Sequence, residues 1–265
     1  MFGPQICFDD GAAYEQMMGV WSQLAGKVFL EWLAPSWGLR WIDIGCGSGA
    51  FTELLVKHCN PAEVQGIDPS EGQLAFARAR LAAPLTKFRQ GDAMALPFPA
   101  HRFDAAVMAL VLVFVSDPSK SIEEMARVVA PGGTVATYVW DMLSGGNPLD
   151  PILDEIRAMG HTPPRPPQMD ASRKDELRDL WVGVGLEAVE TRTITVQRTF
   201  ADFDDFWMAK VRAPTIAPTV AAMGSGEIAT LKRRLRVRLP ADAAGRITYG
   251  ARAHAIKGRV RPWPE

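Results

Sequence analysis

Short apolar runs and stretches with helical spacing alternate along this chain. The clearest case begins at residues 41–44, where an apolar run enters three glycines at alternate positions. Apolar residues then recur with helical spacing through Phe51, Leu54 and Leu55. This pattern predicts a buried strand, a tight turn and the start of a helix.

The alternation continues downstream, and an amphipathic helix at residues 14–33 precedes the first strand. We expect further strands at residues 63–68, 103–110, 134–140, 186–199 and 247–260, and a strand that runs into a loop within residues 87–94. We expect helices at residues 71–81, 117–129, 149–159, 172–182, 201–210 and 231–239. The run Ala130-Pro131-Gly132-Gly133 is expected to be a turn. Strands that alternate with helices predict an α/β fold with a doubly wound sheet and a ligand at the carboxyl ends of its strands.

The glycine turn is the first candidate binding element. Glycine at positions 45, 47 and 49 permits backbone conformations that other residues avoid, and it lets a ligand lie against bare main chain. The following helix directs its free amide groups into the same space. Such a turn suits a nucleotide-like ligand.

Two kinds of nucleotide site share this turn. The spacing Gly45-x-Gly47-x-x-Ala50 satisfies a dinucleotide fingerprint. Asp43, however, lies two residues before the first glycine, where its charge would repel a pyrophosphate and attract a cationic amine or sulfonium. The alternative role for Asp43 is to cap nearby loop amides.

The run Asp43-Ile44-Gly45-Cys46-Gly47-Ser48-Gly49 resembles the first motif of class I S-adenosylmethionine-dependent methyltransferases. Four further segments follow in the family's order, so the resemblance covers roughly residues 14–141. Within the family, the chain resembles the small-molecule branch of quinone-biosynthesis (type 11) enzymes. The resemblance implies a seven-stranded sheet of order 3-2-1-4-5-7-6 whose last strand is antiparallel, with an N-terminal lid helix and inserted cap elements.

Two more acids resemble cofactor ligands of this family. Asp68 ends the second strand, where a carboxylate can accept hydrogen bonds from both ribose hydroxyls. Its alternative role is to cap the next helix, although Ser70 can serve there instead. The run Gly91-Asp92-Ala93 resembles the segment in which the aspartate accepts from the adenine amine.

The resemblance thus implies S-adenosyl-L-methionine as the cofactor. Family members often carry methionine at the position of Gln73, so the chain departs from the pattern there. The expected cofactor-binding residues are Tyr14 in the lid helix, Asp43, Gly45, Cys46, Gly47 and Gly49 in the first motif, Asp68, Pro69 and Gln73 after the second strand, Asp92, Ala93 and Met94 after the third, and Ala109 and Leu110 at the end of the fourth.

The expected reaction is methyl transfer to a small-molecule acceptor, mainly through positioning. The sulfonium is a good leaving group, so alignment of acceptor, methyl and sulfur supplies most of the catalysis. The histidines that many relatives carry after the fourth strand are absent, since residues 111–114 read VLVF. The remaining candidates for a general base are Tyr138, Asp141 and His161.

Other classes of protein stay open. A nicotinamide-dependent oxidoreductase shares the glycine turn, and a catalytically inactive binding subunit could keep the fold and the ligand. Nucleic-acid methylation is disfavoured because residues 109–112 read ALVL, in place of an Asn/Asp-Pro-Pro-aromatic signature.

The composition of the chain bears on its partners, its location and its number of domains. The 265 residues carry a net charge of -1, which argues against nucleic acid as a partner. The three cysteines form no C-x-x-C pair, and we expect no metal site. The start lacks the features of a signal peptide and the apolar run 105–115 is too short to span a bilayer, so we expect a cytoplasmic protein without a membrane span. We expect one domain over residues 1–265, with a lid at 1–37, a cofactor-binding core at 38–141 and substrate-side elements at 142–265.

Overall fold

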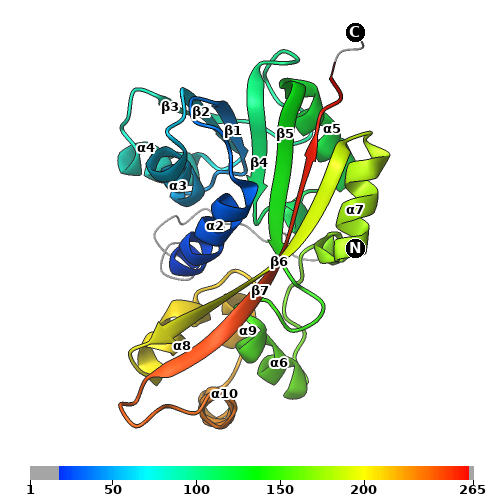
Figure 1. The fold of residues 1–265 in the computed structure, drawn as a ribbon. Coiled ribbons are helices and arrows are strands. Elements are labelled where there is room, and N and C mark those ends of the chain that lie inside the picture. The colour runs from blue at the N-terminus through cyan, green and yellow to red at the C-terminus, as the bar shows by residue number, and fades with distance from the viewer. Residues whose placement is uncertain (1–17, 263–265) are drawn as a thin grey trace.

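The computed structural model describes residues 18–262, and seven strands form a single sheet (Figure 1). The strand order is β3-β2-β1-β4-β5-β7-β6, and β7 runs antiparallel to both of its neighbours. The predicted order and the antiparallel last strand are therefore confirmed. The strands are β1 (Arg40–Ile44), β2 (Glu63–Asp68), β3 (Thr86–Gln90), β4 (Phe103–Ala109), β5 (Val129–Trp140), β6 (Glu187–Phe200) and β7 (Ile247–Arg259).

Helices cover both faces of the sheet. In Figure 1, α2, α3 and α4 lie on one side, and α5 and α7 lie on the other. The helices are α2 (Val20–Leu33), α3 (Ala50–Cys59), α4 (Glu71–Arg80), α5 (Pro118–Val128), α6 (Asp150–Ala158), α7 (Lys174–Gly183), α8 (Phe203–Val211), α9 (Ala217–Ala221) and α10 (Ser225–Arg238), with short 3-10 turns η2 (Leu112–Phe114) and η3 (Met169–Ser172). None of these helices is both long and apolar enough to cross a membrane.

Each central strand divides its side chains between two apolar cores. In β1, Trp41 packs in the core beneath α2 and α3, while Ile42 and Ile44 pack in the core beneath α5 and α7. Successive side chains of a strand point to opposite faces, and a strand covered on both faces needs apolar residues at nearly every position. This requirement explains the apolar runs at 41–44 and 103–109.

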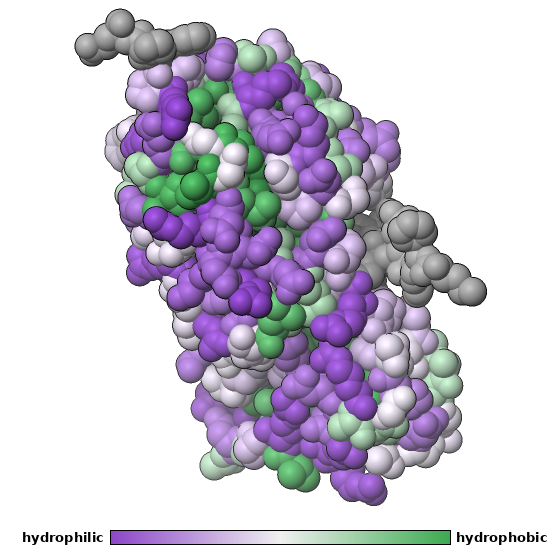
Figure 2. Space-filling model, turned by 90° about the vertical axis from the view of Figure 1, so that its right-hand side faces the viewer, coloured by the Kyte–Doolittle hydropathy of each residue, from purple (hydrophilic) through white to green (hydrophobic). Residues whose placement is uncertain are grey.

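A second lobe extends beyond the sheet. It consists of α6, α8, α9 and α10, packed around the far ends of the paired strands β6 and β7, in the lower part of Figure 1. Phe200, Phe206 and Leu235 of this lobe belong to the same apolar cluster as Phe29 of α2. The lobe and the sheet therefore share one continuous core. On the face shown in Figure 2, hydrophilic side chains cover most of this lobe, and a compact apolar patch lies in the upper half of the molecule.

The structure differs from the expected elements at two points. First, β5 already begins at Val129, which pairs with Phe103 of β4, so the Pro-Gly-Gly run lies inside the strand. Gly132 donates its amide hydrogen to Val260, and a shift of register between β4 and β5 accommodates the run. Tertiary pairing thus converts an expected turn into an irregular strand. Second, the five-residue helix α9 was not expected, since it is too short to show helical periodicity.

Candidate functional site

The glycine turn between β1 and α3 has the predicted backbone. Gly45, Gly47 and Gly49 have φ values of +69°, +52° and +78°. A Cβ atom on Gly45 would lie 2.4 Å from Cγ2 of Val111, so this glycine allows a close approach of two loops. A Cβ atom on Gly47 would meet only Oε1 of Gln73, at 3.8 Å. Gly47 therefore presents bare backbone to an open space.

Asp68 lies beside this turn. Its Oδ2 accepts from the amide of Gly47 and its Oδ1 accepts from the amide of Ser70, each at 2.9 Å. The hydroxyl of Ser70 accepts from the amide of Gln73 at 3.3 Å and thereby caps α4. The cap of α4 is therefore Ser70, and the carboxylate of Asp68 has the capacity to accept from ligand hydroxyls in addition to the two amides.

Asp43 is fully buried at the end of β1. The hydroxyl of Thr52 on α3 donates to its Oδ2 at 2.6 Å, while its Oδ1 has no hydrogen-bond partner among the described residues. Burial raises the pKa of Asp43 to about 7, against the opposing effect of the Thr52 hydrogen bond and with a smaller contribution from the charge of Asp68. No loop amide caps Asp43 in the described part of the chain. Its unpaired oxygen is suited to a donor from a cationic ligand.

The other expected cofactor residues follow the carboxyl ends of neighbouring strands. Asp92 is exposed after β3, and its Oδ1 accepts from the amide of Met94 at 2.9 Å. Gln73 is buried behind the glycine turn, and burial raises the pKa of the Cys46 thiol, so Cys46 is an inert packing residue. Ala93 and Met94 are half-buried beside Asp92, Pro69 is exposed, and Ala109 ends β4. Tyr14 lies outside the described residues.

Leu110 follows β4 at the same edge of the sheet. Its φ of +64° is in the left-handed region, which is uncommon for a residue other than glycine. The amide of Leu110 donates to the carbonyl of Tyr138 at 2.8 Å, which holds this strained backbone in place. Strain of this kind is found where surrounding structure fixes a functional position.

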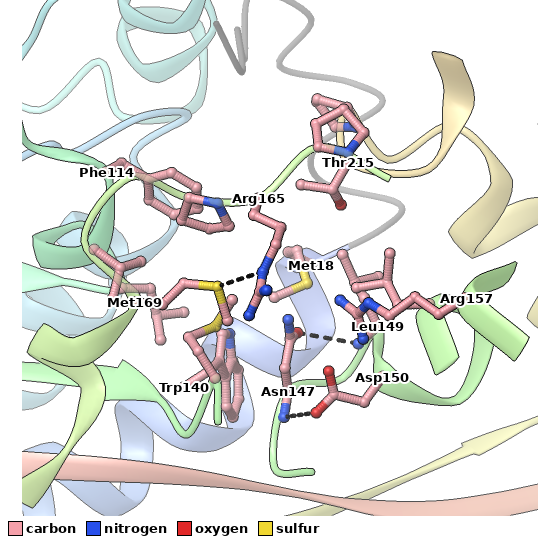
Figure 3. Close-up of a pocket in the computed structure, with 17 residues that line it drawn as sticks. Met18, Phe114, Trp140, Asn147, Leu149, Asp150, Arg157, Arg165, Met169 and Thr215 are labelled. Carbon is pink, nitrogen blue, oxygen red and sulfur yellow. Dashed lines mark hydrogen bonds between the residues drawn. The ribbon is translucent and has the colours of Figure 1, made fainter. Parts of the chain in front are cut away.

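A pocket opens beside Leu110, between the sheet and the second lobe (Figure 3). It encloses about 740 Å³, counting the space that opens to solvent, and most of its lining is apolar. Apolar lining comes from Met18, Leu110, Val113, Phe114, Trp140, Met142, Leu149, Leu153, Pro164, Pro166, Met169 and Pro214, and polar lining from Asn147, Asp150, Arg157, Arg165 and Thr215. In residues 18–262, no group of three or more His, Cys, Asp or Glu side chains is placed to hold a metal ion.

Two of the candidate bases do not reach this pocket. Tyr138 is fully buried, with its ring 4.7 Å from that of Phe29 and 5.8 Å from that of Phe51. The side chain belongs to the core beneath α2 and α3, because alternation along β5 directs it to that face. His161 instead follows α6, and its Nε2 lies 3.2 Å from Oε1 of Glu227 on α10. Neither side chain is among the described residues that line the pocket.

Asp141 does not line the pocket either, and its carboxylate is already paired. Its Oδ2 accepts from Nε and from a terminal nitrogen of Arg252, at 2.9 and 2.6 Å, and its Oδ1 accepts from the amide of Ser144. Burial alone would raise the pKa of Asp141, but these hydrogen bonds outweigh burial and lower it. Asp141 holds the end of β5 to β7. Among the described residues that line the pocket, the carboxylate is that of Asp150. The sequence around Asp150 contains no motif that predicts a place in a binding site.

Comparison with known proteins identifies the core of this chain. The family model described as "Methyltransferase domain" matches residues 42–137, which include the glycine turn, Asp68, Asp92 and Leu110. Residues 42–137 form a methyltransferase domain. The seven-stranded sheet that contains this domain has the strand order of class I methyltransferases.

The chain is also similar to curated proteins. The chain is 37% identical over 105 residues to demethylmenaquinone methyltransferase of Desulfitobacterium hafniense, which covers 38% of this chain and 42% of that protein. It is 35% identical over 143 residues to 2-phytyl-1,4-naphtoquinone methyltransferase of Synechococcus elongatus, over 52% of this chain and 58% of that protein. The chain spans about half the length of the curated relatives it matches.

Beyond the methyltransferase domain, similarity to solved structures concerns the fold. Phosphoethanolamine N-methyltransferase 2 of Haemonchus contortus, solved in complex with S-adenosyl-L-methionine, matches 95% of this chain and 56% of its own with a TM-score of 0.57. The sequence identity is 17%, so this match shows a shared fold and leaves the acceptor open.

Proposed function

We propose that this protein transfers a methyl group from S-adenosyl-L-methionine to an apolar small-molecule acceptor. The proposal is carried by the position of Leu110, which follows β4 and also lines the apolar pocket. The glycine turn and the three acids lie at the carboxyl ends of the parallel strands β1, β2 and β3 in the same sheet. A donor site next to an acceptor site is what a two-substrate transfer requires.

The residues of the first part fit the donor. Asp43 offers a buried oxygen without a partner among the described residues, which a cationic ligand group would complete. Gly47 faces open space, so its backbone permits the close approach of a ligand. We assign Asp68 to the ribose hydroxyls and the exposed Asp92 to the adenine amine, since an ionised carboxylate only accepts hydrogen bonds.

The bound sulfonium would supply both the activated methyl group and the leaving group. The chain's own residues then have to orient the acceptor and exclude water. Trp140, Met142 and Leu149 line the acceptor side with apolar surface, and the strained backbone of Leu110 fixes the boundary between the two sides. Positioning of this kind can lower a barrier by roughly 7–11 kcal/mol in favourable cases.

A nicotinamide cofactor fits this crevice less well. A pyrophosphate over the glycine turn would lie close to both Asp43 and Asp68, and the repulsion would be strong at short range. The names of the curated relatives refer to naphthoquinone-type compounds, which agrees with an apolar small molecule as the acceptor here.

The purified chain, incubated with S-adenosyl-L-methionine labelled in its methyl group and with a cell extract, tests this proposal. We expect label in an apolar compound, and we expect less of it with Asp68→Ala at the same concentration of S-adenosyl-L-methionine, because this change weakens the donor site. Label only in protein or nucleic acid would contradict the proposal, as would the absence of any transfer by a chain that binds the donor.

A further inference from the structure

The acceptor pocket contains one carboxylate among its described lining residues, that of Asp150, and its two oxygens have different surroundings. Oδ2 accepts from the amide of Asn147 at 2.8 Å, whereas Oδ1 accepts no hydrogen bond from the described residues. Asp150 is the first residue of α6 and is 8% exposed. The amide it accepts precedes the helix, so Asp150 does not cap α6. One oxygen is fixed by the protein and the other remains available to a ligand.

Two further polar atoms of the pocket point to a ligand. Oγ1 of Thr215 and Nε1 of Trp140 are buried and have no hydrogen-bond partner in the described part of the chain. Thr215 is 7% exposed and Trp140 is 6% exposed. In Figure 3 the hydroxyl of Thr215 is directed into the space that the other pocket residues surround. Buried polar atoms without partners are costly, and a ligand with its own polar groups would satisfy them.

The pocket also carries uncompensated positive charge. Arg165 enters it from the proline-rich loop at residues 160–168, and Figure 3 shows its guanidinium directed toward the pocket centre. Nε of Arg165 lies 3.2 Å from Sδ of Met169, and the guanidinium forms no ion pair with a carboxylate of residues 18–262. Arg157 lines the pocket as well but is paired with Asp154 at 3.1 Å.

The charges of Asp150 and Arg165 favour some classes of acceptor over others. An acceptor that binds as an ammonium would meet the guanidinium of Arg165, which has no carboxylate partner among residues 18–262, and like charges at close range are unfavourable. A hydroxyl compound can donate its proton to the carboxylate and then leave its negative oxygen near Arg165. The apolar lining favours a compound whose remaining body is a hydrocarbon or aromatic ring.

We propose that the pocket binds a ring compound with an acidic hydroxyl group, a phenol or an enol, and that Asp150 is the catalytic base that accepts its proton while Arg165 stabilises the oxyanion. This inference rests on the proposed function. The acceptor's O–H bond breaks, and the proton passes to Oδ1 of Asp150. The electron pair left on the oxygen, or delocalised from it into the ring, forms the bond to the methyl carbon as the carbon–sulfur bond breaks toward sulfur. Asp150 then returns the proton to water.

The electrostatic setting agrees with this role. Burial raises the pKa of Asp150 to about 6, opposed by the hydrogen bond from the amide of Asn147. A carboxylate of higher pKa is a stronger base and still ionised at neutral pH. The charged or titratable groups that face Asp150 are Asp154 and Arg157 on α6, Asp141 at the end of β5, Tyr249 on β7 and Arg165 in the proline-rich loop.

Equilibrium titration of the purified full chain with 2-naphthol and with 2-methoxynaphthalene, followed by ligand fluorescence, tests the inference without any turnover. The methoxy compound has the same ring system but cannot donate a hydrogen bond. We expect the wild-type chain to bind 2-naphthol about tenfold more tightly, which is the effect of a hydrogen bond to a charged acceptor. This preference should decline as the pH falls below about 6, because protonation of Asp150 removes its charge.

The variant Asp150→Asn should reduce the preference to less than about threefold and abolish its dependence on pH, with little change in binding of 2-methoxynaphthalene. Asp170→Asn replaces an exposed carboxylate next to the pocket residue Met169 and is the matched control. Arg165→Gln changes a residue in an exposed loop, and it provides a second test if Asp150→Asn does not fold. This variant should weaken binding of 1-nitro-2-naphthol, which is more acidic than 2-naphthol, and leave binding of 2-methoxynaphthalene unchanged.

Failure of the inference and failure of the proposed function give different results. If the chain binds S-adenosyl-L-methionine but shows no preference for 2-naphthol, or keeps that preference in Asp150→Asn, the assignment of Asp150 is overturned alone. If 2-naphthol binds as expected but S-adenosyl-L-methionine does not bind, the proposed function fails and the hydroxyl-binding pocket stands. During turnover with a hydroxyl acceptor, Asp150→Asn should lower kcat more than it raises KM, and it should change the pH dependence of kcat. If Asp150 had only a structural role, the pH dependence of kcat would stay as in the wild type.

Discussion

At the scale of single residues, Asp43 combines a binding role with a cost to the fold. Its carboxyl group is fully enclosed and has only Thr52 as a partner among the described residues. The folded state therefore favours the protonated carboxyl, whose pKa of about 7 compares with an ordinary value of 3.8. Between these pH values the folded state holds a proton that the unfolded state has lost, so Asp43 makes the fold less stable as the pH rises from about 4 to about 7.

Replacement of Asp43 by asparagine should separate these two effects. The new amide would still accept from Thr52 but carries no charge, so we expect Asp43→Asn to be at least as stable as the wild type at pH 8. Its melting temperature should be higher by about 2 °C or more, since 1 kcal/mol corresponds to roughly 2–4 °C in a domain of this size. Binding of S-adenosyl-L-methionine should nevertheless weaken about tenfold, because a charged acceptor is lost.

Thermal melts of both proteins from pH 5 to pH 8, followed by circular dichroism, check the prediction, and calorimetry measures the binding. The two melting curves should diverge as the pH rises. Parallel behaviour over this range would show that Asp43 is ionised in the folded state without penalty.

The residues that we propose for the donor can be singled out in the sequence because they lie close together along the chain. Asp43 and the glycines lie within seven consecutive residues, and Asp68 ends the strand predicted at residues 63–68. Asp150 was missed for the opposite reason. Its significance depends on Trp140, Arg165 and Thr215, which come from separate loops and strands and meet only in the folded chain. The spacing of these residues in the sequence does not predict that they lie close together.

At the scale of secondary-structure elements, Asp141 and Arg252 connect β5 to β7. These strands also exchange backbone hydrogen bonds here, since Asp141 donates its amide hydrogen to the carbonyl of Arg252 at 2.9 Å. The side chain of Asp141 is buried while that of Arg252 is partly exposed. The pair holds β5 and β7 together at the point where the chain leaves β5 toward the second lobe.

Replacement of Asp141 by asparagine should destabilise the fold by about 1–3 kcal/mol, because charge-assisted hydrogen bonds are lost and a guanidinium is left without its partner. The pKa of Asp141 is lowered in the folded state, so its contribution is present above the ordinary value of 3.8 and is lost as the pH falls below that value. Urea unfolding at pH 7 and at pH 3.5 measures both effects.

The matched control for this experiment is Asp175→Asn, which breaks an Arg–Asp pair at 2.9 Å on the exposed surface of α7. We expect no measurable change in its urea midpoint, since exposed ion pairs contribute little. Equal destabilisation of the two variants would contradict the account of Asp141 as a connection between strands.

Most elements were predictable because periodicity reports burial directly. The strand at 63–68 was predicted with the observed bounds, and the sheet order agrees with the order that the resemblance implied. The start of β5 was not predictable, since Pro131 and two glycines mark a turn in any local reading. Val129 pairs with Phe103, and Gly132 donates its amide hydrogen to Val260. These contacts with residues far away in the sequence place the segment in a strand.

At the scale of the whole molecule, the proposed donor and acceptor sides are built from different parts of the fold. The donor side follows β1, β2 and β3 of the sheet, while the acceptor side is completed by α6, the proline-rich loop and Thr215 of the second lobe. Leu110 lies at the boundary. The lobe can therefore determine the choice of acceptor while the sheet keeps a constant donor site.

This division predicts independent effects of variants on the two sides. Arg165→Gln should raise KM for the acceptor about tenfold, the effect of losing a charged hydrogen-bond donor, and leave the dissociation constant for S-adenosyl-L-methionine unchanged within about a factor of two. Asp68→Ala should do the reverse, and the two effects should add in the double variant. Steady-state kinetics and calorimetry on the four proteins measure this, and an Arg165→Gln variant that binds the donor poorly would show that the two sides are not separate.

The central claim concerns the ligand of the glycine turn, and a calorimetric titration tests it most directly. The wild-type chain, Asp68→Ala and the exposed control Glu71→Ala are each titrated with S-adenosyl-L-methionine and with NAD⁺. We expect one molecule of S-adenosyl-L-methionine per chain, unchanged affinity in Glu71→Ala, and a loss of about 1.5–3 kcal/mol in Asp68→Ala, or roughly 10- to 150-fold. Binding of NAD⁺ in place of S-adenosyl-L-methionine, or equal affinity of a folded Asp68→Ala variant, would contradict the account.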